Sequence, residues 1–213
     1  MSFDTLIDQL ADDLQPVRPR RFWVDVGVMA IIAASELALL FAVGFANLDL
    51  HRLETQPTFG WRLVSLGLIS LAAGCAAIRS FDPTFSSKRS VRLLAAIIAI
   101  CALGGSFLGT RPGGLSALLQ RLAWTDGIHC AFHIVVLSLP PLAGLVLLGR
   151  RGAPTDMRRT RLLVGLAAAA WGAFAFVFSC PFNDPLFILT WYGLACTTTV
   201  LVARYLLPRL ARW

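Results

Sequence analysis

The sequence predicts an all-α polytopic membrane protein: a bundle of six transmembrane helices with both termini in the cytoplasm. Of its 213 residues, 57% are hydrophobic and 15% are charged, and the mean hydropathy is +0.71. A soluble domain usually carries about 25% charged residues. The charges here gather in short clusters between long apolar runs. This pattern excludes a disordered chain and disfavours an ordinary water-soluble domain.

Six apolar runs are candidate membrane spans, because a helix needs about 20 predominantly apolar residues to cross a bilayer. They cover about residues 22–46, 63–78, 93–108, 128–148, 162–178 and 185–207. Pro140 and Pro141 interrupt the fourth run, where we expect a kink because neighbouring helices can satisfy the freed carbonyl groups. The chain therefore divides into a cytoplasmic segment, 1–21, and a transmembrane domain, 22–213.

The basic residues predict the orientation of these spans. Fifteen of the 19 Lys and Arg residues fall in the N-terminal segment, the second and fourth connections and the C-terminal end. The other side of the predicted membrane carries Arg52, Arg62, Arg111 and Arg121. Because cytoplasmic loops are enriched in Lys and Arg, both termini are expected in the cytoplasm.

The segment 2–14, SFDTLIDQLADDL, is expected to form a short amphipathic helix, since its apolar residues recur at helical spacing. Its other face is acidic and would be repelled by an anionic inner leaflet. The helix either folds back on the inner end of the bundle or lays its apolar stripe into a groove of a basic soluble protein. The second interpretation is favoured, with these candidate partner-binding residues: Phe3, Asp4, Leu6, Ile7, Asp8, Leu10, Asp12, Asp13 and Leu14.

Two of the five cysteines are expected at the outer surface of the membrane. Cys130 opens the fourth span and Cys180 follows the fifth, whereas Cys75, Cys101 and Cys196 are interpreted as small buried apolar residues. The chain has no C-x-x-C motif. In an oxidising outer compartment, an exposed pair is expected to form either a disulfide or a metal site.

Two histidines accompany Cys130. His129 and His133 are four residues apart, so on a helix their side chains can converge with that of Cys130. With Cys180 they would form a set suited to a soft or borderline ion such as copper, zinc or cadmium, although no cofactor is obligatory. In the alternative interpretation, His129 is an interfacial residue and His133 is a hydrogen-bonded residue of the bundle.

Two carboxyl groups lie in the first span, Asp25 near its cytoplasmic end and Glu36 near its centre, on one helix face. An ionisable group at the bilayer midplane is costly and usually has a function or a partner. Glu36 could pair with an inward histidine, relay protons or be held neutral. A role in structural or regulatory packing is the favoured interpretation.

Two motifs and two cysteines carry a resemblance to a known family. The opening LIDQLADDLQPVRPR and the stretch CPFNDPLFILTWYGLAC, with the tail LLPRLARW, resemble the terminal segments of the NrsF negative regulators of sigma factor F. Cys130 and Cys180 match the two outward cysteines of that family. The resemblance implies a six-span anti-sigma factor of the bacterial inner membrane, whose partners are an extracytoplasmic-function sigma factor and the lipid bilayer, with no direct nucleic-acid contact. Heavy metals or oxidants would act at the cysteines and release the sigma factor.

Other functions are weighed against this one. A small transporter or metal exporter could use Glu36, His133 and Cys130, but the sequence has no obvious inverted repeat or paired broken helices. A membrane thiol oxidoreductase would need a second cysteine pair, and the remaining cysteines are scattered in depth. A conventional enzyme is not expected, because the chain has no P-loop, G-x-S-x-G, H-E-x-x-H or dinucleotide motif.

Overall fold

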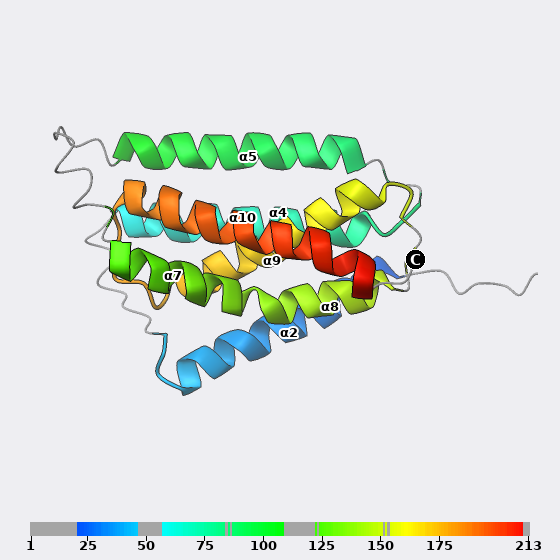
Figure 1. Cartoon of the computed structure of the whole chain (residues 1–213), viewed down its shortest axis with the longest axis horizontal. Helices are drawn as coiled ribbons and strands as arrows, with labels where there is room; N and C mark the ends of the chain where they lie inside the picture. Colours follow the sequence, from blue (N-terminus) through cyan, green and yellow to red (C-terminus); the bar gives the residue numbers. More distant parts are fainter. Residues whose placement is uncertain are drawn as a thin grey trace, which may run out of the picture.

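A computed structural model describes residues 21–46, 57–83, 85, 87–108, 122, 124–150, 152 and 154–210, with side chains as far as 206. These residues form helices α2 (Phe22–Ala42), α4 (Pro57–Arg79), α5 (Ser87–Leu108), α7 (Trp124–Leu137), α8 (Leu139–Gly149), α9 (Met157–Phe176) and α10 (Pro185–Leu210). The helices lie along one long axis (Figure 1). The predicted all-α class is therefore confirmed for the described part of the chain.

Five helical segments among the described residues are long and apolar enough to cross a membrane: α2, α4, α5, the α7–α8 pair and α10. Helix α9, which overlaps the fifth predicted span, is not among them, because its first five residues include three arginines and many of the others are alanine. Twelve of its 20 residues are buried. Protein rather than lipid therefore surrounds α9, and small side chains are enough to pack it.

Several helix limits differ from the predicted spans. Helices α4 and α5 begin at Pro57 and Ser87, about two turns before the apolar runs, because a helix satisfies its own backbone beyond the hydrocarbon region as well as within it. Helix α2 ends at Ala42 rather than at residue 46. Gly44, with φ of 72°, ends it in a Schellman motif in which Phe45 N donates to Leu40 O (3.0 Å) and Gly44 N to Phe41 O (3.1 Å).

The interruption in the fourth predicted span lies at Ser138 rather than at the two prolines. Helix α7 ends at Leu137 and α8 begins at Leu139, and α8 continues in the direction of α7 (Figure 1). Pro140 and Pro141 occupy the first turn of α8. They have no N–H to donate to the carbonyls of Val136 and Leu137 four residues earlier, so the helical hydrogen bonding is interrupted between α7 and α8. Ser138, between the two helices, keeps a helical backbone (φ −79°, ψ −16°), and its hydroxyl donates to Ile134 O at 2.7 Å.

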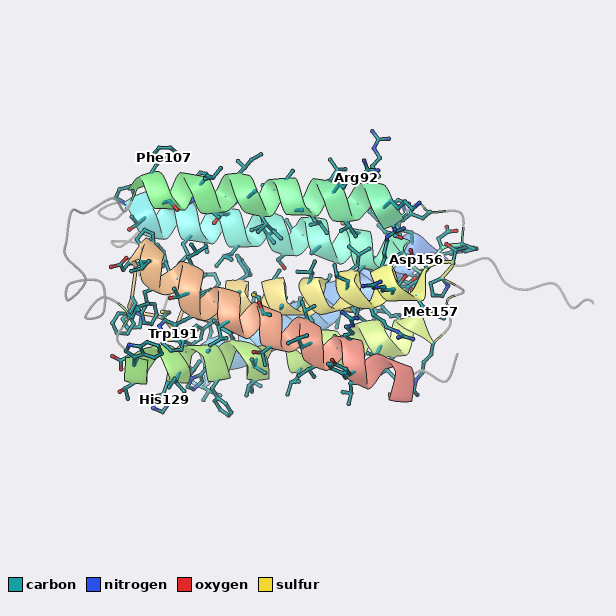
Figure 2. The ribbon with its side chains drawn as sticks, turned by 45° about the horizontal axis from the view of Figure 1, so that its top comes forward. Arg92, Phe107, His129, Asp156, Met157 and Trp191 are labelled. Carbon is teal, nitrogen blue, oxygen red and sulfur yellow. The ribbon has the colours of Figure 1, made fainter. Side chains whose placement is uncertain are left out.

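The bundle has two distinct ends (Figure 2). Arg92, Asp156 and Met157 mark one end, and Phe107, His129 and Trp191 mark the other, which we call the outer end after the predicted orientation. Helix α2 begins and α10 ends at the end opposite the outer end (Figure 1). The predicted amphipathic helix and its partner-binding residues lie outside the described residues.

The buried apolar residues form two clusters. One lies among α4, α8 and α9 and includes Ala77, Leu145 and Val164. The other lies toward the outer end, among α7, α9 and α10, and contains both Cys130 and Cys180. Helix α9 contacts α4, α7, α8 and α10, so it connects the two clusters.

Candidate functional site: a buried thiol pair at the outer end

Cys130 and Cys180 meet at the outer end of the bundle. Cys130 lies early in α7 and Cys180 lies in the turn between α9 and α10. Both are free cysteines. Their thiols are hydrogen-bonded to each other. The sequence predicted an exposed pair, but Cys130 is only 6% exposed and Cys180 only 1%, because aromatic residues of α9 and α10 pack over them.

The turn that carries Cys180 is fixed by its own backbone and by the start of α10. Cys180 N donates to Phe176 O at 3.1 Å. Asp184 caps α10, because its Oδ1 accepts a hydrogen bond from Leu186 N at 2.9 Å, and Pro185 suits the first helical position. Phe182 stacks on Phe187 with ring centroids 4.7 Å apart. The turn therefore holds the Cys180 sulfur in a defined place.

Arg62 of α4 is a residue of this site that sequence analysis treated only as one of the outer charges. It is 3% exposed, and its guanidinium donates to the backbone carbonyls of the Cys180 turn. The acceptors are Val177 O at 3.0 Å, Cys180 O at 3.2 Å and Phe182 O. Since a buried charge needs such partners, Arg62 ties α4 to the turn. The sequence did offer one signal for this role: Arg62 is a charged residue directly before the second apolar run.

The surroundings of Cys180 favour its ionised form. The hydrogen bond from the Cys130 thiol lowers the pKa of Cys180 to about 6, with support from the Arg62 charge and against the opposing effect of burial. Cys180 is therefore the member of the pair that ionises first. The thiolate is the form of cysteine that attacks oxidants and ligates soft metals.

The ionisation of Cys180 can be measured as a pH titration. We expect the thiolate ultraviolet absorbance of the wild type, minus that of Cys180→Ser, to rise with a midpoint near pH 6. Cys130→Ala and Arg62→Gln should each move the midpoint upward, toward the value of about 8.5 for an ordinary thiol. The change at Cys130 should be the larger one, because it removes the direct donor. A wild-type midpoint near the ordinary value would contradict this description of the pair.

The two histidines do not join the thiol pair. His129 is exposed. The His133 ring stacks on Phe176 with centroids 5.7 Å apart, and its Nδ1 lies 2.7 Å from His129 O. Among the residues that the structure describes, no three His, Cys, Asp or Glu side chains are grouped to hold a metal ion. The predicted four-residue metal set is therefore not formed, because helical spacing brings side chains near one another without fixing where each one points.

The intramembrane carboxyl groups have structural surroundings. Asp25 and Glu36 are both largely buried. Trp171 of α9 donates from Nε1 to Glu36 Oε2 at 2.9 Å, so the partner of Glu36 is an indole and not a histidine. This contact joins α2 to α9, and it agrees with the packing role favoured from the sequence.

Trp171→Phe should weaken the bundle, because both carboxyl oxygens of Glu36 would then be buried without a donor among the described residues. Interhelical hydrogen bonds in membranes contribute about 0.6–2 kcal/mol, so we expect a loss of about 1 kcal/mol. Thermal unfolding in detergent would measure this change. Glu36→Gln, which keeps an acceptor for the indole, should be closer to the wild type, and the opposite order would contradict the assignment.

Fold and site together describe an α-helical protein of membrane type with a buried, hydrogen-bonded thiol pair at one end. Residues 10–213 match the NrsF family model, described as "Negative regulator of sigma F". The chain belongs to this family. It is 30% identical over 220 residues to "Anti-sigma-F factor NrsF" of Caulobacter vibrioides (strain NA1000 / CB15N), with 100% of both chains covered. No solved structure matches the chain.

Family membership confirms the resemblance found in the sequence. It supports a regulatory role rather than an enzymatic one, and a sigma factor as the partner. It gives no support to the transporter alternative. The apolar helices are consistent with a place in a membrane.

Proposed function

We propose that this protein is a six-span anti-sigma factor of the bacterial inner membrane, with both termini in the cytoplasm. It sequesters an extracytoplasmic-function sigma factor of the sigma F type through residues 1–21 and releases it when heavy metals or oxidants act on Cys130 and Cys180. Family membership supports the regulation of sigma F. The observation that carries the sensing step is the hydrogen bond between the two thiols at the outer end.

The chemistry of the sensing step follows from a thiolate beside a thiol. The Cys180 thiolate attacks a peroxide oxygen, and the resulting sulfenic acid condenses with Cys130 to form a disulfide. The two cysteines lose two electrons and the Cys130 proton, and the peroxide takes up this proton and one from the solvent as it is reduced to two water molecules. A soft metal ion would instead bind both sulfurs as thiolates and displace the Cys130 proton. Oxidation replaces the hydrogen bond between the two sulfurs with a shorter covalent bond, and metal binding replaces it with an ion held between them. Either reaction changes how α7 and the Cys180 turn are held together.

A route from this link to the cytoplasmic end is provided by contacts along the bundle. Movement of Cys130 shifts α7, which continues through Ser138 into α8. Helix α8 packs on α2, where Met29 and Ile32 lie against Gly144. Since α2 directly follows the sigma-binding segment, two arrangements of α7–α8 would present that segment differently. A signal of this kind must shift such an equilibrium to have an effect.

The sigma-binding step rests on the acidic, amphipathic character of residues 2–14. Its aspartates are complementary to the basic surfaces with which a sigma factor binds promoter DNA. Charge complementarity of this kind directs the choice of partner and speeds association. The bound segment would therefore compete with DNA for the same surface.

Binding is tested by recovering cellular proteins with the detergent-solubilised full-length chain and with a variant lacking residues 2–15. We expect a sigma factor with the first bait and none with the second. Recovery of the same proteins by both baits, without a sigma factor, would contradict the proposal. A control in which Asp8 and Asp12 are replaced by Asn should bind more weakly than the wild type while keeping the length of the segment.

Release is tested in cells with a reporter driven by the sigma factor. Cadmium or peroxide should induce the reporter in the wild type but not in Cys130→Ser or Cys180→Ser. Cys196→Ser is the matched control, since Cys196 is a free cysteine of α10 outside the pair, and it should respond like the wild type. Full induction in both pair variants would disprove sensing at these cysteines while leaving the binding proposal intact.

A further inference from the structure

An apolar cavity of about 350 Å³ lies between α4, α5, α9 and α10. Aliphatic and small side chains form most of its wall, among them Ala73, Ile98, Leu166, Ala169 and Ile188. An apolar cavity of about 150 Å³ is already large enough to stay dry and bind a molecule such as benzene. A larger apolar cavity in a membrane protein is therefore expected to hold an apolar molecule rather than water.

Arg62 gives this cavity a polar end. The side chain lines the cavity and is 3% exposed. Its terminal nitrogens donate to the Cys180 turn, whereas its Nε has no hydrogen-bond partner among the described residues. A buried donor without an acceptor is costly, so an acceptor brought by a ligand would be favourable here.

The cavity is partly open, and its opening is expected on the side of α5. Helix α5 lies at the edge of the bundle (Figure 1), and only 6% of its membrane-length window is buried. Trp61 of α4 holds the outer part of α5, since its Nε1 donates to Cys101 O at 3.2 Å and its ring packs against Gly104. Gly193 of α10 lines the cavity and is exposed. A molecule in the bilayer can therefore reach the cavity between α5 and α10.

We propose that this cavity binds one acyl chain of a membrane phospholipid, with the ester carbonyl accepting a hydrogen bond from Arg62 Nε. Arg62 follows the start of α4 by five residues, which is about 7.5 Å along the helix. That depth is close to the boundary of the hydrocarbon region of about 30 Å, where ester groups lie. The long apolar wall below Arg62 suits the chain. This lipid site is independent of the proposed sigma-factor function.

The test is photocrosslinking of the full-length protein in vesicles that contain phosphatidylglycerol with a diazirine on one acyl chain. Gly193→Leu should fill the opening without a clash, because a Cβ at Gly193 meets no atom within 4 Å. Gly74→Leu is the matched control, since a Cβ there is equally free of contacts and Gly74 does not line the cavity. We expect the wild type and Gly74→Leu to be labelled on the α5 and α10 peptides that line the cavity, and Gly193→Leu several-fold less.

Equal labelling of these peptides in the wild type and Gly193→Leu would overturn the proposal. Labelling by a photoactivatable isoprenoid quinone but not by the phospholipid would overturn the acyl-chain assignment. If Gly193→Leu does not fold, Gly105→Leu on the α5 wall replaces it, because its Cβ makes only ordinary contacts with Trp61. Arg62→Lys keeps a positive charge but has no Nε donor, so its folded fraction should be labelled less by the ester lipid than the wild type is, and unchanged labelling would exclude the role of Arg62.

Discussion

Arg62→Met is expected to detach the Cys180 turn from α4 and to destabilise the protein by about 1–3 kcal/mol for each buried carbonyl left without a donor. The substitution keeps much of the apolar stem and removes the donors to Val177 O, Cys180 O and Phe182 O. Those carbonyls would remain buried without their arginine donor, which is the costly half of a lost hydrogen bond. Thermal unfolding in detergent, monitored by circular dichroism, would measure the loss.

Arg62→Lys separates charge from geometry in this prediction. Lysine keeps a positive charge beside the thiol pair, but a single ammonium group lacks the planar fork with which arginine reaches several carbonyls. We expect its stability to lie between those of the wild type and Arg62→Met. If Arg62→Met were as stable as the wild type, the anchoring role of Arg62 would be wrong.

Gly172→Val is expected to force α9 away from the α7–α8 junction. A Cβ at Gly172 would lie 2.3 Å from Ser138 Oγ, 2.6 Å from Ile134 O and 2.9 Å from Ser138 N. Two of these atoms belong to the backbone, so rotation of a side chain cannot relieve the overlap. Overpacking of this kind costs about 1–3 kcal/mol and sometimes more, and we expect at least the upper value here, measured by unfolding in detergent.

Two further variants make the Gly172 prediction specific. Gly74→Val should have little effect, because a Cβ at Gly74 meets nothing within 4 Å. Ser138→Ala combined with Gly172→Ala should recover only part of the stability lost in Gly172→Ala, since the Ile134 carbonyl still blocks the new methyl group. Full recovery in this double mutant would show that the hydroxyl alone sets the packing distance.

The parts of the fold that depend on local pattern could be predicted from the sequence. Hydropathy located the helical runs, and Asp184 and Pro185 indicated the start of α10, where Asp184 caps the helix. Hydropathy is a weaker guide for α9, because a helix surrounded by protein is packed by alanine and glycine rather than by lipid-facing leucine. The two prolines indicated an interruption in the fourth run, and the structure has it at Ser138, two residues before Pro140.

The candidate site was predicted only in part because its contacts connect distant segments. The meeting of Cys130 and Cys180 followed from their common side of the membrane and from the family resemblance. Arg62 lies 115–120 residues before the carbonyls it binds, and Trp171 lies 135 residues after Glu36. No local pattern in a single sequence connects such pairs. The two histidines were predicted to be metal ligands from their local spacing alone. That spacing is present, but His133 stacks on the Phe176 ring of a neighbouring helix instead of joining the thiol pair.

The small side chains and the arginines of α9 have a consequence for how the protein is made. A segment with three arginines at its start and little apolar surface of its own has a weak tendency to leave the translocation channel for lipid by itself. In the proposed six-span topology, α9 would therefore enter the bilayer together with the more apolar α10, as a helical hairpin. The turn with Cys180 is the tip of that hairpin, so Cys180 would cross the membrane during biogenesis before it can meet Cys130 and Arg62.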